Sequence, residues 1–114
     1  GELSGTASAA GSFSFEIGVS DTISLCSASR IYTIVVCGIS VNLGPAWAYG
    51  EVNVPYPGRQ FTASNSVGGL TWSSLYTLPT GITINSTGYL SGTPTSAGTF
   101  YFGVAAVDSL GCYA

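Results

Sequence analysis

The side chains that could carry chemistry in this chain are few, and their types exclude most catalytic mechanisms. The 114 residues include two arginines, five carboxylates and three cysteines, but neither lysine nor histidine. Without those two residue types the sequence offers no Ser-His-Asp or Cys-His arrangement and no lysine for a Schiff base. The five carboxylates are scattered along the sequence and form no close pair. We therefore expect a protein that is not an enzyme and needs no cofactor.

The cysteines and one asparagine remain as candidates for covalent chemistry. Cysteines stand at positions 26, 37 and 112. An odd count in a secreted chain suggests an intermolecular bond or a free thiol. Asn85-Ser86-Thr87 is a glycosylation sequon in a predicted turn, so Asn85 is a candidate glycosylation site.

Aromatic residues offer a third kind of candidate site. Trp47, Tyr49 and Tyr56 lie in a segment rich in proline and glycine and could stack on a sugar or on a protein partner. Aromatic side chains that close the end of a domain are the simpler interpretation, and we prefer it. Trp72 is expected in the core.

Charge is scarce, which limits the partners that the chain can have. Charged residues make up 6% of the sequence and the net charge is −3. This balance lacks the basic surface that nucleic-acid binding requires. No run of apolar residues is long enough to predict a membrane span. A surface so poor in charge favours coverage by neighbouring subunits.

The elements that must position these residues are strands separated by turns. Apolar residues alternate with polar or small ones from Phe13 to Val19 and again from Phe100 to Ala106, the pattern of a half-buried strand. Short strands at such spacing predict an all-β antiparallel sandwich. Further strands are expected at 30–36, 39–43, 59–64, 70–73 and 81–85, with turns at 44–45, 55–58, 66–69, 78–81 and 93–94.

The chain contains an internal repeat with an offset of 87 residues. Gly1–Asp21 aligns with Gly88–Asp108, and ten of the 21 positions are identical. A repeat of this length predicts tandem modules, each of them a packed unit.

Several segments resemble one known family. Leu78–Asp108, with Ser91-Gly-Thr-Pro94 inside it, is similar to the most characteristic stretch of the bacterial Putative Ig (cadherin-like) tandem repeat, and Val52–Tyr56, Phe61–Ser64 and Leu70–Trp72 fit its upstream part. The resemblance covers about residues 37–114, and 1–36 resembles the last third of a preceding copy. Ala7 and the stretch 47–52 depart from the pattern.

The resemblance implies an Ig-like antiparallel β-sandwich in an extracellular or cell-surface protein, without a specific chemistry. Phased by the repeat, residues 1–36 would be the C-terminal strands of a preceding module. Residues 37–114 would be an Ig-like module without its last strand, because no counterpart of 30–36 follows Cys112. Such a module exposes an apolar groove and an unpaired sheet edge.

The phasing also suggests how the cysteines pair. In an Ig-like sandwich, the loop before the last strand and the start of the first strand lie at the same end. We therefore expect a disulfide between Cys37 and Cys112. Cys26, the repeat counterpart of Cys112, would be unpaired or intermolecular. A Cys26–Cys37 bond is the less favoured alternative, because a strand separates the two residues.

Two aspartates are candidates for calcium binding. Asp21 and Asp108 end equivalent strands, and some cadherin-like modules bind calcium at module junctions. Calcium requires six to eight oxygen ligands. An aspartate that stabilises a turn by bonding its own backbone is the interpretation we favour.

The leading functional hypothesis is a structural subunit of an extracellular filament that assembles head to tail with copies of itself. The leading segment of one chain would complete the groove of the next by strand addition. The candidate donor residues are Tyr32, Ile34 and Val36, with Phe13, Phe15 and Ile17 as the competing choice.

Two alternatives remain. The chain could be a window of a much longer tandem-repeat adhesin or stalk, in which both ends continue covalently. A carbohydrate-binding module that uses Trp47 and Tyr49 is the third hypothesis.

Overall fold

The computed structural model describes residues 1–45 and 49–114. The chain divides into two compact units, Gly1–Cys37 and Gly38–Ala114. The described residues form nine β-strands and no helix, and every pairing between the strands is antiparallel. The fold is therefore all-β, as the alternating pattern predicted.

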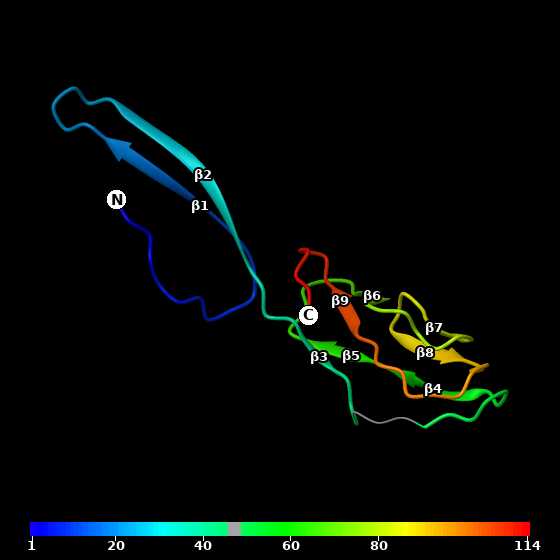
Figure 1. The fold of residues 1–114 in the computed structure, drawn as a ribbon. Coiled ribbons are helices and arrows are strands. Elements are labelled where there is room, and N and C mark those ends of the chain that lie inside the picture. Colours follow the sequence, from blue (N-terminus) through cyan, green and yellow to red (C-terminus); the bar gives the residue numbers. More distant parts are fainter. Residues whose placement is uncertain (46–48) are drawn as a thin grey trace. The chain divides into compact units, whose positions relative to one another are not determined.

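The first unit is a β-hairpin of two long strands. β1 (Gly11–Ser20) pairs with β2 (Ser27–Val36) over all ten residues, from Gly11 opposite Val36 to Ser20 opposite Ser27. Figure 1 shows the two strands side by side, in blue and cyan. The alternation of aromatic or β-branched residues with small polar ones favours this extended, pleated conformation.

The second unit holds seven strands in three small sheets. In the largest sheet β8 lies between β4 and β7 (Figure 1), and the other two sheets are the pairs β3–β5 and β6–β9. The strands are β3 (Ser40–Asn42), β4 (Tyr56–Gln60), β5 (Thr62–Ser64), β6 (Thr71–Ser74), β7 (Ile82–Ile84), β8 (Tyr89–Gly92) and β9 (Val104–Val107).

The core of this unit lies where side chains from all three sheets meet. Phe61, Trp72, Leu90 and Ala106 are buried and pack together. The rings of Phe61 and Trp72 are stacked, with centroids 6.1 Å apart. Trp72 is 5% exposed, so its expected place in the core is confirmed.

One glycine is required beside this core. Gly88 adopts a φ of +85°, and a Cβ built on it would lie 2.9 Å from the Trp72 ring. Gly88 ends the tight turn between β7 and β8, where its N–H donates to the Asn85 carbonyl. A left-handed φ and close contact with an indole together favour glycine at this position.

Three of the differences between the predicted and the observed strands lie within residues 55–92. The expected turn at 55–58 lies largely in β4, because a register shift between Tyr56 and Arg59 accommodates Pro57-Gly58 within the strand. The expected strand 59–64 is interrupted at Phe61, which separates β4 from β5. β8 was not predicted, since the Ser-Gly sequence in it is more typical of loops.

Candidate functional site

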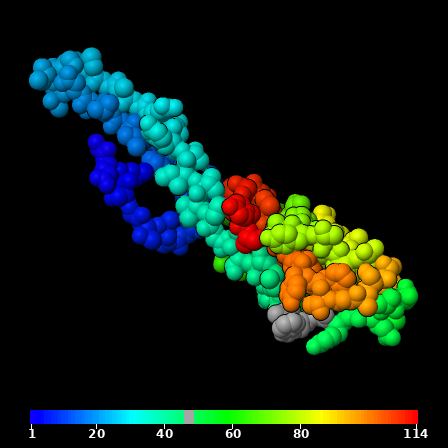
Figure 2. Space-filling view, viewed as in Figure 1, coloured from blue at the N-terminus to red at the C-terminus, as the bar shows by residue number. Residues whose placement is uncertain are grey.

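One face of the hairpin is apolar and largely open to solvent. Directly opposite residues on this face include the pairs Phe13–Ile34 and Phe15–Tyr32. Phe13 is 47% exposed, and Tyr32 and Ile34 are each 44% exposed. Figure 2 shows this hairpin in blue to cyan. A two-stranded ribbon of this kind has only marginal stability by itself in water.

The other face of the hairpin is mixed but more polar. The hydroxyls of Ser14 and Thr33 lie 2.8 Å apart, and the Ser29 hydroxyl donates to the Glu16 carboxylate. Ile31 is 69% exposed on this face. The two faces therefore offer different surfaces to a second layer.

β9 has a strand neighbour on only one side within the described residues. It pairs with β6, from Thr71 opposite Val107 to Ser74 opposite Val104. On its other side, Ala106 and Ala114 exchange both backbone hydrogen bonds, at 3.0 and 3.1 Å, and Tyr113 bridges to Val107. Tyr113 and Ala114, which the sequence analysis did not single out, thus pair with β9 in the way that the start of β2 pairs with β1.

The repeat makes β9 the counterpart of the last four residues of β1. With the offset of 87, β1 corresponds to residues 98–107, but only Val104–Val107 is a strand. The expected strand from Phe100 is therefore too long at its start. The physical reason is the ladder: β1 pairs with β2 along its whole length, whereas residues 98–103 have no strand partner in the described chain.

The turns that follow these strands in the two repeat copies share their principal hydrogen bonds. The Asp21 N–H donates to the Cys26 carbonyl at 2.8 Å, and the Asp108 N–H donates to the Cys112 carbonyl at 2.9 Å. Each aspartate carboxylate also accepts the N–H of the residue two positions later. The turns of the two copies thus share these hydrogen bonds, although the turn from Asp21 to Cys26 is one residue longer than the turn from Asp108 to Cys112.

Both turn carboxylates accept several hydrogen bonds. Asp108, 7% exposed, accepts N–H groups from Val67, Leu110 and Cys112 at 2.9 to 3.1 Å. Its pKa is lowered chiefly by the Val67 N–H. The pKa of Asp21 is lowered first by the Ser24 hydroxyl, which donates at 2.6 Å. Such bonds favour the ionised carboxylate.

This geometry is that of aspartates that stabilise turns. The candidate calcium role of Asp21 and Asp108 stays a prediction. Within residues 1–45 and 49–114, three metal-ligating side chains do not gather at any point.

The cysteines are in two different states. Cys37 and Cys112 are both disulfide-bonded. Cys26 is an exposed free thiol, and its sulfur lies 3.7 Å from the Ser24 carbonyl. That Cys37 and Cys112 are bonded to each other stays a prediction. A disulfide is typical of proteins that mature in an oxidising compartment.

Asn85 stabilises the turn between β7 and β8. Its side-chain oxygen accepts the N–H groups of Thr87 and Tyr89 at 3.1 and 2.9 Å and the Thr87 hydroxyl at 2.7 Å. The residue is exposed. Its glycosylation stays a prediction.

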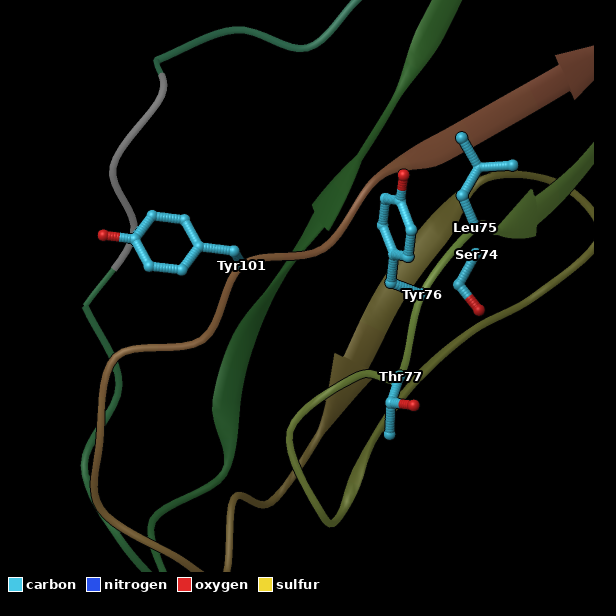
Figure 3. Close-up of a pocket in the computed structure, with 5 residues that line it drawn as sticks. All are labelled: Ser74, Leu75, Tyr76, Thr77 and Tyr101. Carbon is cyan, nitrogen blue, oxygen red and sulfur yellow. The ribbon is translucent and has the colours of Figure 1, made fainter.

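The aromatic candidates are dispersed. Trp47 lies outside the described residues, Tyr49 is 93% exposed, and Tyr56 packs against the core. A different hollow, which the sequence analysis missed, is lined by Ser74, Leu75, Tyr76, Thr77 and Tyr101. Figure 3 shows Tyr76 and Tyr101 on opposite sides of it, from the segments after β6 and before β9. Tyr101 could have been identified from the sequence, because it lies between Phe100 and Phe102 and so points to the opposite side from these two residues in an alternating segment.

No helix in the described part of the chain is long and apolar enough to cross a membrane. No curated protein matches the sequence. A family model described as Putative Ig domain matches residues 40–114, which is more than half of the chain and includes all seven strands of the second unit. Ig-like domains of this kind are typically non-enzymatic. The expected resemblance is therefore confirmed, and the chain belongs to the Putative Ig domain family.

Proposed function

We propose that this protein is a structural subunit of an extracellular fibre, in which copies join head to tail by strand complementation. β2 of one copy lies beside β9 of the next and completes its sheet. The observation that carries this proposal is the internal repeat: β1 is a ten-residue strand paired with β2, whereas its counterpart is a strand over only four residues.

The repeat predicts the register of the proposed contact. β1 pairs Phe13 with Ile34 and Phe15 with Tyr32. With the offset of 87, Ile34 of the incoming β2 lies opposite Phe100, and Tyr32 lies opposite Phe102. At the C-terminal end of β9, Tyr113 already lies opposite Val107 and Ala114 opposite Ala106. The donor strand would occupy the positions opposite the residues that precede Ala106.

The contact buries apolar surface that both partners expose. Phe100 is 42% exposed, and Tyr32 and Ile34 are each 44% exposed. Main-chain hydrogen bonds supply the ladder, and alternate side chains determine the register. The contact also desolvates one charged side chain of β2, Arg30, which pairs with Ile17 in the hairpin and lies opposite Val104 in the proposed register. The disulfide-bonded cysteines support an extracellular location.

Chain connectivity favours a second copy over the same chain as the donor. β3 begins at Ser40, and its partner strand β5 leads to Val67, whose N–H donates to the Asp108 carboxylate. In the proposed register Val36 lies opposite Gly98, and an extended strand from Gly98 to Asp108 is about 33 Å long. Only three residues lie between Val36 and Ser40, so the Cα atoms of these two residues can be at most about 14 Å apart.

The test is a pair of matched substitutions in β2. Ile34→Asp places a carboxylate on the face that would be buried, and we expect it to abolish filaments while monomers stay soluble. Ile31→Asp places the same charge on the opposite face and should leave assembly close to that of the parent. Filaments of unchanged yield from Ile34→Asp, seen by electron microscopy and sedimentation, would contradict the proposal.

A second candidate is a repeat unit within one long covalent chain that serves as a stalk or adhesin. The pairing of Tyr113 and Ala114 with β9 favours it, because these residues already follow the path of β2. A non-reducing SDS gel of native material separates the two candidates. Steps of 11.6 kDa that collapse on boiling or reduction indicate separate subunits, and one large band that never collapses indicates a continuous chain.

A further inference from the structure

We propose that β1 blocks assembly in the free subunit, because it occupies the only edge of β2 that can enter the next copy. Each β2 must then separate from its own β1 before it pairs with β9 of another molecule. This inference rests on the proposed strand complementation and adds a control step to it.

At the open edge of β9, the backbone N–H and C=O groups belong to the residues whose side chains face the core. Ala106 aims both its backbone groups at Ala114, away from β6. The Gly103 carbonyl points the other way and accepts the Leu75 N–H. Since backbone direction alternates along a strand, Val104 and Phe102 aim at the open edge as Ala106 does. All three pack in the core or against it.

In an incoming strand, the residues whose backbone groups bond to β9 are therefore the ones whose side chains face the core. Residues directly opposite each other in an antiparallel pair share one face of the sheet. The apolar residues of β2 that suit the core are Tyr32 and Ile34. We call the edge of β2 toward which the backbone groups of Tyr32 and Ile34 point the donor edge, because it is the edge that would bond to β9.

That edge of β2 is the one that β1 covers. The Asp21 N–H donates to the Cys26 carbonyl, which sets the phase of the hairpin ladder. Hydrogen-bonded pairs alternate with non-hydrogen-bonded pairs along an antiparallel ladder. Phe15–Tyr32 and Phe13–Ile34 are therefore hydrogen-bonded pairs, because both lie an even number of positions from the Asp21–Cys26 pair. The donor edge and the hairpin edge are thus the same.

Docking the intact hairpin through the outer edge of β2 gives the wrong face. Backbone groups on the outer edge belong to Ser29, Ile31, Thr33 and Val35, so these side chains would face the core of the acceptor. Their neighbours on β1 include Ser14 and Glu16. The hydroxyls and the Glu16 carboxylate would be desolvated, while Tyr32 and Ile34 would stay exposed.

A disulfide clamp across the hairpin tests this inference. Ser14 and Thr33 are directly opposite and their hydroxyls lie 2.8 Å apart. By the same phase they form a non-hydrogen-bonded pair, whose Cα separation of about 4.5 Å suits a disulfide. The full chain carries Ser14→Cys and Thr33→Cys in a Cys26→Ser background, and the Cys26→Ser parent is carried through the same oxidation and reduction.

We expect the oxidised clamp to lose filament formation and the reduced clamp to regain the yield of its identically treated parent. Filaments from the oxidised clamp at the parent's yield would overturn the inference, because the hairpin would then dock intact. That result would leave strand complementation to the Ile34→Asp test. Failure of the untreated parent to assemble would instead contradict the proposed function itself.

A second variant moves assembly in the opposite direction. Phe15 stacks on Tyr32, with ring centroids 6.3 Å apart. Phe15→Ser removes this contact and leaves β2 unchanged, so the lag before filament formation should shorten severalfold. A longer lag or lost assembly would contradict the blocking role of β1 and favour β1 itself as the donor strand.

Discussion

Truncation of one side chain on β2 gives a quantitative test of the proposed contact. Ile34 is 44% exposed in the hairpin, and this remaining surface would be buried against the next subunit. Burial of a whole aliphatic side chain contributes about 1.5–3 kcal/mol, so the 44% still exposed corresponds to about 0.7–1.3 kcal/mol. Ile34→Ala should therefore raise the critical concentration for filament formation about three- to tenfold.

The assay is sedimentation of filaments over a series of protein concentrations. Ile31→Ala is the matched control, because it removes the same atoms from the face that stays outside the acceptor core. Its critical concentration should change by less than about twofold. Equal shifts for both variants would refute the assignment of the buried face, and a shift for Ile31 alone would place the opposite face in the contact.

Further predictions concern the stability of the subunit. Leu90→Ala removes a side chain that is 4% exposed in the core and should lower the free energy of unfolding by about 2–5 kcal/mol. A urea titration that gives less than about 1 kcal/mol would contradict its core position. The lowered pKa of Asp108 means that its ionised form stabilises the fold. This contribution is complete above the unfolded-state pKa and is lost as pH falls through the folded-state pKa. The urea midpoint should therefore fall below about pH 4, and Asp108→Asn should flatten that dependence; an unchanged slope would contradict the role of the carboxylate. If Cys37 and Cys112 are bonded to each other, each single serine variant and the double variant should lose a similar amount, about 2–4 kcal/mol, whereas additive losses would contradict the pairing.

The sequence predicted the parts of this fold that depend on local pattern. The alternation from Phe13 to Val19 predicted β1, and the repeat predicted that Asp21 and Asp108 end equivalent strands. Trp72 was placed correctly in the core. These features follow from side-chain periodicity and turn chemistry, which a sequence displays directly.

The parts that depend on strand partners could not be predicted in this way. Residues 100–103 have the same alternation as β1, yet they are not a strand, because ladder bonds require a neighbour. Pro57-Gly58 indicates a turn, yet it lies in β4, since the pairing with β8 accommodates a register shift there. The hydrogen bond from Val67 to Asp108 joins residues 41 positions apart and has no local signature.

The most direct test of strand complementation is a disulfide between two different subunits. By the proposed register Thr33 of one copy lies opposite Tyr101 of the next. Chains with Thr33→Cys are mixed with chains with Tyr101→Cys, both in the Cys26→Ser background, and are oxidised after assembly. We expect a dimer of twice 11.6 kDa on a non-reducing gel only from the mixture, and none when Ser96→Cys replaces Tyr101→Cys. Filaments that form without this cross-link, or that cross-link equally through Ser96→Cys, would contradict the pairing of β2 with β9 on which the account depends.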